Sequence, residues 1–414
     1  MTRKWTPGVI VAHVLFYGVF LAACAYVYYL GAMGVEESDL PDHFMRAADM
    51  SMANYSLNRF LIYPGYAIGD MLGASILLAA YTALTAGIVE YLIFKMVPRC
   101  TLGAALVLAF MANFAIAIFI PMVHPNIYSG VVTGNSWHNS TYLTMRLFAL
   151  LAILFYLRIT GRIETPSGIA IKVLNYLLFA VCVFVATGVK PSFYVVFAPA
   201  ILVMCIIDLK RAGKSSVKRS ILLGICLVIP LIIVATQYDV LFNKSENAGG
   251  IGFGIAVVWQ DSNDNIPVAI LQSFAFPFAV LIGSYRQIAE DRNFLFAWLM
   301  ALFGFLEYFF IYETGPRMYH ANFAWSLQLG AFYLMASCSI ALLNAHPKPL
   351  EKLKIVLPEH ETVQQRYSYT ASASGRERAY VYLCLVLYVL HALSGLLLFG
   401  LMFTGHSFLW KARL

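Results

Sequence analysis

Acidic and basic side chains are concentrated in residues 36–46 of a chain in which only 12% of residues are charged. A helix from Leu40 to about Leu57 would place four of these side chains at positions i, i+3, i+4 and i+7, on one face. The four are Asp39, Asp42, His43 and Arg46. A carboxylate placed in this way can take the proton of an attacking hydroxyl, which is worth roughly 10²–10⁴ in rate. The two aspartates are therefore the candidate catalytic residues, and the histidine and the arginine are candidate substrate-binding residues. The alternative is that Ser38 or Asp39 only caps this helix.

A second polar cluster lies between the third and fourth apolar runs and contains Trp137, His138 and Asn139. Trp137 beside His138 offers an aromatic stacking face next to a hydrogen-bonding imidazole, a combination that suits a sugar. The alternative is an interfacial anchor at Trp137 and a solvated imidazole at His138. All three residues are candidate substrate-binding residues.

Isolated cations mark two further connections between apolar runs. Lys190 lies at the outer end of a tight apolar hairpin, where a cation is costly unless it snorkels or meets an anion such as phosphate. The Gly315-Pro316 turn brings Glu313 close to Arg317, whose planar guanidinium matches phosphate oxygens. The alternative is an internal ion pair that only fixes this loop. These residues and His320 complete the candidate substrate-binding set.

The composition indicates an all-α polytopic membrane protein. Hydrophobic residues make up 61% of the 414 residues, well above the roughly half that is usual in soluble domains. Eleven apolar runs approach the roughly 20 residues that span a bilayer. They are 8–31, 71–95, 101–122, 143–158, 172–189, 193–208, 220–238, 266–284, 294–312, 326–345 and 380–403. The segment 54–70 is expected to lie on the outer membrane surface as an interfacial helix.

The distribution of lysine and arginine predicts that the N-terminus is cytoplasmic. In this orientation 20 of the 28 basic residues face the cytoplasm, in agreement with the positive-inside rule. The other eight lie outside or at the outer boundary, and they are Arg46, Arg59, Arg146, Lys190, Lys244, Arg317, Lys411 and Arg413. The net charge of +7 then indicates contact with anionic membrane lipid, and no nucleic-acid partner is expected.

Polarity divides the chain into three parts: a transmembrane catalytic core over 1–345, a cytoplasmic linker over 346–379, and a C-terminal transmembrane helix with a short tail over 380–414. All seven cysteines lie in or beside apolar runs, so neither a disulfide framework nor a thiolate metal site is expected. No cofactor is expected, and a divalent cation is left open.

In this topology all the polar clusters face the exported side. Carboxylates beside cations, within an aromatic-rich rim, suit a reaction between a hydroxyl acceptor and an anionic, lipid-linked donor. Arginine and lysine can stabilise a departing phosphate, for which one lost electrostatic contact costs on the order of 10²–10³ in rate.

The acidic first loop, Ser38-Asp39-Leu40-Pro41-Asp42-His43, followed by an interfacial helix and many spans, resembles the GT-C superfamily of integral-membrane glycosyltransferases. The resemblance implies a sugar donor linked to polyprenyl phosphate or pyrophosphate and a glycan or lipid-linked acceptor. It also implies inverting transfer on the exported face of a bacterial inner membrane, with Asp39 as the general base. The pattern Glu313-x-Gly-x-Arg317 resembles the late loop cation that binds donor phosphate in such families.

Two other classes of protein stay open. A repeat-unit polymerase of an exported polysaccharide would use the same donor and the same cations, and the length of its product would distinguish it. A lipid or sugar transporter would instead place charges within the spans, near the midplane. The main ionisable groups of that kind in this sequence are Glu90 and Glu307.

Overall fold

The structure is a computed structural model that describes residues 5–49, 56–243, 249–357 and 373–412. Some predictions concern residues outside these ranges. They are the cytoplasmic or outer placement of Arg3, Lys4, Lys244, Arg366 and Arg413, the first part of the interfacial segment 54–70, and residues 358–372 of the predicted linker.

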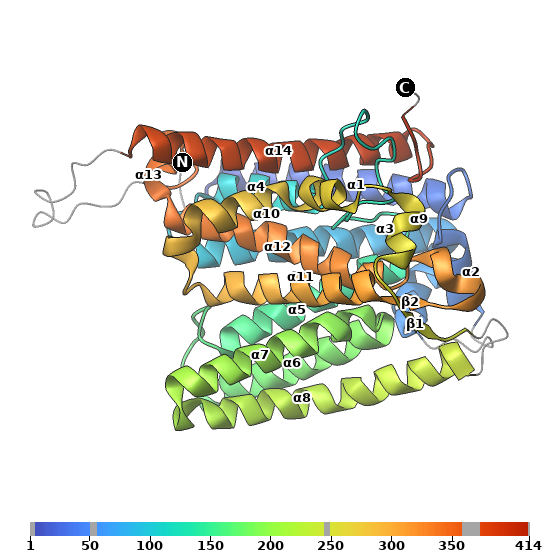
Figure 1. Ribbon diagram of the computed structural model, residues 1–414, viewed down its shortest axis with the longest axis horizontal. Helices are drawn as coiled ribbons and strands as arrows, with labels where there is room; N and C mark the ends of the chain where they lie inside the picture. Colours follow the sequence, from blue (N-terminus) through green and yellow to red (C-terminus); the bar gives the residue numbers. More distant parts are fainter. Residues whose placement is uncertain (1–4, 50–55, 244–248, 358–372, 413–414) are drawn as a thin grey trace, which may run out of the picture.

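Long apolar helices run roughly parallel to one another in a single bundle (Figure 1). Within the described residues, ten helices are long and apolar enough to cross a membrane. They are α1 (Pro7–Ala32), α3 (Asn58–Met96), α5 (Ser140–Ile159), α6 (Ile169–Val189), α7 (Ser192–Ala212), α8 (Lys214–Tyr238), α10 (Ile266–Ile288), α11 (Arg292–Phe310), α12 (Ala324–Ala345) and α14 (Gly375–Phe403). Each overlaps one of the predicted spans, so the prediction of an all-α polytopic membrane protein is confirmed.

The third predicted span, 101–122, is wrong in its length. The helix in this place, α4 (Leu102–Phe114), is shorter because the chain leaves helical geometry at Ala115. The side-chain amide of Asn135 donates to the carbonyl oxygens of Ala112 and Ala115, at 2.9 and 2.8 Å. These hydrogen bonds satisfy acceptors that the end of a helix leaves free. A residue from a later loop thus helps to end α4, and the apolar sequence around the helix end does not predict this.

Helix α3 contains a sharp turn between two arms. Gly69 and Asp70 leave helical geometry there, and Asp70 has a φ of 49°. The two arms lie against each other. They are so close that a Cβ atom on Gly65 would come within 2.6 Å of the carbonyl oxygen of Gly73. The first arm is the described part of the predicted interfacial segment, and the second arm is the predicted span 71–95.

Most of the short elements gather at the right-hand end of the bundle in Figure 1. They include α2 (Leu40–Ala48), α9 (Val257–Ser262) and the antiparallel strands β1 (Ile251–Phe253) and β2 (Ile311–Glu313). The π-helical turn η1 (Asp239–Asn243) and the 3₁₀ helix η2 (Gly315–His320) adjoin these strands in sequence. Helix α13 (Pro347–Lys352) lies at the opposite end. Helix α2 is shorter than predicted, because it ends at Ala48 and not near Leu57.

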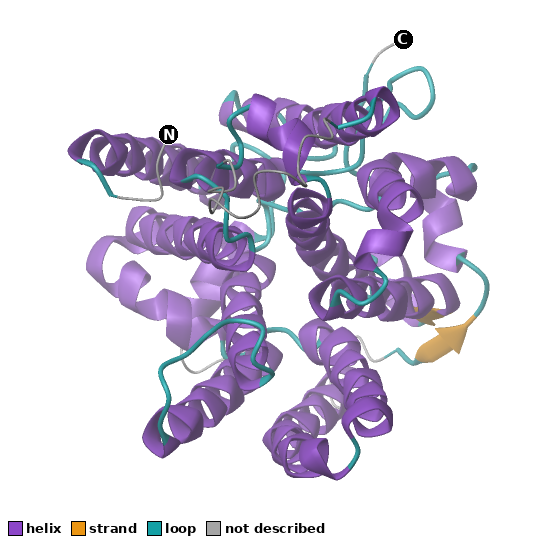
Figure 2. Ribbon diagram, turned by 90° about the vertical axis from the view of Figure 1, so that its left-hand side faces the viewer, coloured by secondary structure: helices purple, strands orange, loops and turns teal. Residues whose placement is uncertain are grey.

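Helix α12 is the most deeply buried helix. All of its residues from Trp325 to Leu343 are buried. It packs closely on α11, since a Cβ atom on Gly330 would lie 2.8 Å from the Cα atom of Ala301. Figure 2 looks along the bundle from the α13 end and shows the helices nearly end-on, with the two strands at the edge. Because α12 is buried along its length, its first turn is held in place at the end of the bundle where α2 lies.

Candidate active site

Asp39 begins helix α2 with a carboxylate that does not bind the helix. Ser38 Oγ accepts the N–H of Leu40 at 3.2 Å, and the Asp39 side chain makes no cap hydrogen bond. Asn139 Nδ2 donates to Asp39 Oδ2 at 2.6 Å, and the Asp39 N–H donates to the carbonyl oxygen of His138 at 3.1 Å. The capping alternative is therefore wrong for Asp39. These contacts join the first loop to the loop that precedes α5.

A chain of hydrogen bonds connects Asp39 to Lys190. Asn139 Oδ1 accepts from Thr141 Oγ1 at 2.6 Å, and Thr141 Oγ1 accepts from Lys190 Nζ at 2.9 Å. Asn139 is also the N-cap of α5, where its Oδ1 accepts the N–H of Tyr142 at 2.9 Å. This cap orients the amide so that its NH₂ group faces Asp39. The start of α5 thus holds a carboxylate and an ammonium at fixed positions.

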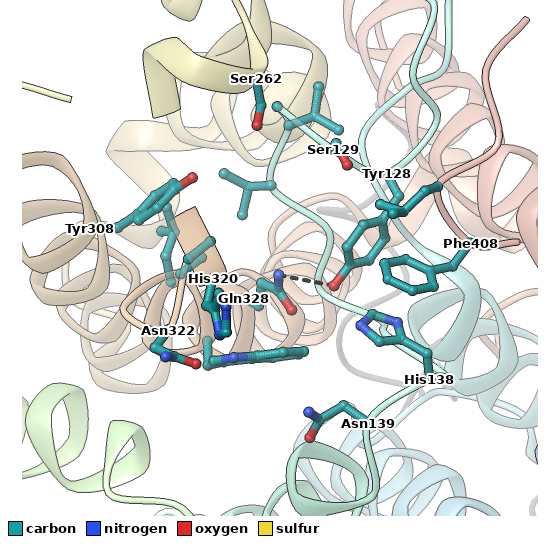
Figure 3. A pocket seen from close by; sticks show the side chains of 18 of the residues that line it. Tyr128, Ser129, His138, Asn139, Ser262, Tyr308, His320, Asn322, Gln328 and Phe408 are labelled. Carbon is teal, nitrogen blue, oxygen red and sulfur yellow. Dashed lines mark hydrogen bonds between the residues drawn. The ribbon is translucent and has the colours of Figure 1, made fainter. Parts of the chain in front are cut away.

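Asp39 lines a cavity of about 400 Å³, which we call the polar cavity. Figure 3 shows its walls, with Tyr308, His320 and Asn322 on one side and Tyr128, His138 and Phe408 on the other. Gln328 of α12 lies between them, and its Nε2 donates to Tyr128 Oη at 3.3 Å. Hydroxyl, amide and imidazole groups of this kind can both donate to and accept from the hydroxyl groups of a glycan.

A second cavity of about 210 Å³, which we call the apolar cavity, has a different lining. Apolar or aromatic side chains of α7 and α8 form one part of it, namely Val195, Val234 and Tyr238. Lys190, Glu313 and Arg317 form another part. Trp325 and Asn322 line both cavities, so the two share a wall. The ammonium of Lys190 lies 4.4 Å from the centre of the Trp325 ring, an arrangement that stabilises a desolvated cation.

Desolvation lowers the pKa of Lys190, His43 and His138. It lowers the pKa of Lys190 to about 8, although the carboxylate of Asp39 acts in the opposite direction. It also lowers the pKa of His43 and that of His138 to about 4, so both imidazoles are neutral at pH 7. His43 Nδ1 lies 3.0 Å from Ser140 Oγ. A phosphate beside Lys190 would favour the charged form of this lysine.

Glu313, at the end of β2, and Arg317, in the loop that follows, form the internal ion pair that was the alternative to phosphate binding. Arg317 Nη2 lies 3.3 Å from Glu313 Oε1, and Asn322 Nδ2 donates to Glu313 Oε2 at 2.7 Å. Glu313 is buried and is paired with Ile251 across the two strands. The side chain of Arg317 is 24% exposed and also lines the apolar cavity. The pair therefore fixes the loop and leaves the guanidinium accessible.

Four predicted site residues do not line either cavity. Asp42 and Arg46 form an exposed ion pair on α2, with Nε and Oδ1 2.8 Å apart, while His43 faces the start of α5. Trp137 is only 1% exposed. Its ring packs against Phe114 and Phe399, with centroids 5.6 and 5.4 Å apart. The prediction of a sugar-stacking face at Trp137 is therefore wrong, because the hydrophobic core encloses this ring.

Sequence reasoning misses three residues that shape the site: Thr141, Trp325 and Phe408. The first two adjoin the predicted polar clusters, and this proximity is the signal that could have identified them. Phe408 has no such signal. It stacks on His138, with centroids 3.6 Å apart and planes 4° apart. It reaches the cavity because the C-terminal segment pairs with a distant loop, where the N–H of Ala412 donates to the carbonyl oxygen of Pro125 at 2.9 Å.

Asp39 is the one carboxylate that lines the polar cavity among the described residues. Glu36 is buried with neither oxygen hydrogen-bonded, and desolvation raises its pKa to about 8. Glu37 is exposed and accepts from Ser407 Oγ at 3.4 Å. In the part of the chain that the structure describes, no three His, Cys, Asp or Glu side chains are grouped so as to hold a metal ion.

No family model and no curated protein matches this chain. Solved structures do match. One is the archaeal oligosaccharyltransferase AglB from Archaeoglobus fulgidus in complex with an inhibitory peptide and a dolichol-phosphate, with a TM-score of 0.53 and 11% identity. Another is the Archaeoglobus fulgidus oligosaccharyltransferase in the apo form, with a TM-score of 0.51 and 11% identity. The chain has a GT-C-like fold. The GT-C-like fold extends over 93% and 95% of this chain and over 56% of each neighbour, so the chain spans little more than half of their length.

Proposed function

We propose that the protein is an inverting glycosyltransferase that moves a sugar from a polyprenyl-phosphate or polyprenyl-pyrophosphate donor to a glycan or lipid-linked acceptor. The observation that carries this proposal is the hydrogen-bond chain from Asp39 to Lys190, which connects a polar cavity to an apolar cavity across a shared wall. The neighbour AglB is described with a dolichol-phosphate and a peptide, which agrees with a lipid phosphate in one cavity and an acceptor in the other.

The acceptor occupies the polar cavity, where its hydroxyl meets the accessible carboxylate of Asp39. Asp39 takes the hydroxyl proton while the oxygen attacks the anomeric carbon of the donor sugar. The bond from that carbon to the donor phosphate oxygen breaks with its electron pair. Because the new bond forms opposite the departing phosphate, the configuration inverts. A base in this position contributes roughly 10²–10⁴ in rate.

The donor places its polyprenyl chain against the apolar side chains of α7 and α8 and its phosphate beside Lys190 and Arg317. These cations stabilise the negative charge that develops on the leaving phosphate, a contribution on the order of 10²–10³ in rate for each contact. The cap at the start of α5 holds Lys190 at a fixed separation from Asp39. Inversion requires the base and the leaving group on opposite sides of the reacting carbon, and an acceptor in the polar cavity with the donor phosphate in the apolar cavity meets this requirement.

The exported face of a bacterial plasma membrane is part of the same proposal. It rests on the distribution of lysine and arginine, which places the end of the bundle with α2 outside.

The substitution Asp39→Asn tests the general base, because it keeps the size of the side chain and removes its basicity. In a transfer assay with purified donor, we expect a folded variant that is slower by roughly 100-fold or more. The matched control is Asp42→Asn, since Asp42 is a neighbouring carboxylate that pairs with Arg46 at the surface, and its rate should stay within about twofold. A slow Asp42→Asn beside an active Asp39→Asn would move the base to Asp42. Full activity of both variants would overturn the mechanism. The product length in the same assay separates single transfer from polymerisation.

A further inference from the structure

The end of the bundle opposite the candidate active site contains a cavity of about 150 Å³ that is rich in arginine. Its walls come from the end of α5, the turn that follows it, the end of α7, and the starts of α8 and α11. We call it the arginine cavity and define it by Arg162, Asp208, Arg219 and Arg292, and Thr160 also lines it. The sequence places this end of the bundle in the cytoplasm.

The arginine cavity has more positive charge than its own carboxylate can neutralise. Asp208 binds two of the three arginines: its Oδ2 lies 3.0 Å from Arg219 Nη2, and its Oδ1 binds Arg292 Nη2. Among the described residues Arg162 has no ion-pair partner, and it is exposed. The nearby Asp291 accepts the N–H groups at the start of α11 and does not line the cavity. Three guanidinium groups thus face one carboxylate.

A structural role accounts for only part of this arrangement. The contacts of Asp208 tie together α7, α8 and α11, and two arginines are sufficient for that purpose. The third arginine adds like charge to a partly desolvated place, which costs free energy unless an anion is present. Arg292 is held in position, with only 9% of its side chain exposed. The exposed Arg162 leaves the cavity open to a ligand.

We propose that the arginine cavity binds the phosphate group of an anionic phospholipid headgroup. Its volume of about 150 Å³ is well above the roughly 10–15 Å³ that one water molecule needs, so there is room for one phosphate group. Guanidinium groups bind phosphate oxygens in a bidentate manner, and basic pockets between membrane helices on the cytoplasmic side bind anionic headgroups. A free phosphate ion has the same chemistry, and the experiment below distinguishes the two sources.

Native mass spectrometry of the purified full chain, titrated with phosphatidylglycerol or with phosphatidylcholine, tests the proposal. The wild-type protein should bind phosphatidylglycerol in preference to phosphatidylcholine. The variant Arg162→Gln loses one charge-assisted contact and should bind phosphatidylglycerol about tenfold more weakly or worse. The matched control is Lys172→Gln, which removes the same charge from an exposed position at the same end of the bundle, outside the cavity. Its affinity should change by less than about twofold.

A second titration uses inorganic phosphate in detergent without added lipid. Binding of phosphate alone that Arg162→Gln weakens and Lys172→Gln does not, with no preference for phosphatidylglycerol, would assign the cavity to a free phosphate. Equal effects of the two variants, or equal binding of both lipids together with no binding of phosphate, would overturn the proposal. The result does not depend on sugar transfer, so the two proposals can fail separately.

Discussion

Lys190 is a cation whose charge depends on pH close to neutrality, because desolvation lowers its pKa to about 8. In the proposed reaction the protonated form binds the donor phosphate. Below pH 8 the charge is present, and above it the charge is lost. We therefore expect kcat/KM for the donor, which reports the free enzyme, to fall about tenfold for each pH unit above about 8.

The variant Lys190→Arg separates this lysine from other groups that titrate in the same range. A guanidinium stays charged at any accessible pH, so the alkaline fall should move upward by at least about one pH unit. Measurement of kcat/KM for the donor between pH 6 and pH 10 provides the comparison. An unchanged alkaline limb in Lys190→Arg would assign the fall to another residue.

Thr141 is the single hydroxyl between the amide of Asn139 and the ammonium of Lys190. The substitution Thr141→Val keeps the shape of the side chain and removes both hydrogen bonds. Because hydrogen bonds to charged groups contribute about 1.5–3 kcal/mol, we expect kcat/KM to fall about tenfold or more. Thr141→Ser retains the hydroxyl and should stay within about threefold of the wild type. Equal losses in both variants would indicate a packing role for the methyl group and no role for the hydroxyl.

At the scale of the elements, the two arms of α3 depend on glycine. A Cβ atom on Gly73 would overlap the carbonyl oxygen of Gly65, whereas a Cβ atom on Gly69 would meet nothing within 4 Å. Gly69 also has a φ of −154°, which any residue can adopt. Gly73 and Gly69 both lie close to the turn in α3, so Gly69 is the matched control for a substitution at Gly73.

Thermal unfolding in detergent should separate these two positions. Gly73→Ala forces the arms apart, and such overpacking costs about 1–3 kcal/mol, so we expect a clear fall in the midpoint of unfolding. Gly69→Ala should leave the midpoint nearly unchanged. The first arm also reaches the site, since Asn58 Nδ2 donates to Ser140 Oγ at 2.9 Å. Equal stability of the two variants would show that the arms do not pack closely in the membrane protein.

At the scale of the whole molecule, the bundle has two chemically different ends. One end carries the polar and apolar cavities, and the other carries the arginine cavity. The structure also shows where labels can reach each end. Met122 and Tyr319 are 84% and 59% exposed at the first end. Ser136 at the same end is fully buried, so a label would not reach it. Lys172 and Lys210 are exposed at the other end.

Cysteine labelling in intact cells tests which end faces outward. Each natural cysteine is at least partly buried, so new cysteines can be read against a low background. Met122→Cys and Tyr319→Cys should react with an impermeant maleimide, and Lys172→Cys and Lys210→Cys should react only after the membrane is opened. Labelling of Lys172→Cys in intact cells would contradict the predicted orientation and the cytoplasmic placement of the arginine cavity.

The positions of the helices can be predicted from the sequence alone, because a membrane span is a local property: about 20 consecutive apolar residues are sufficient to define it. Ten spans were correct for this reason, and α4 was not, because a side chain from a later loop ends it. The sequence also indicated which connections carry polar chemistry, since charged groups are costly within the bilayer.

Which of these polar residues meet depends on the packing of the helices. Asp39 and Asn139 lie 100 positions apart in sequence, and Lys190 is 49 positions from Thr141, so their contacts depend on how whole helices pack. The same packing enclosed Trp137 in the core and brought Phe408 to the site. Residue type and spacing describe one segment at a time, whereas a cavity is formed by side chains from several segments. Its lining therefore follows from packing between helices that are distant in the sequence.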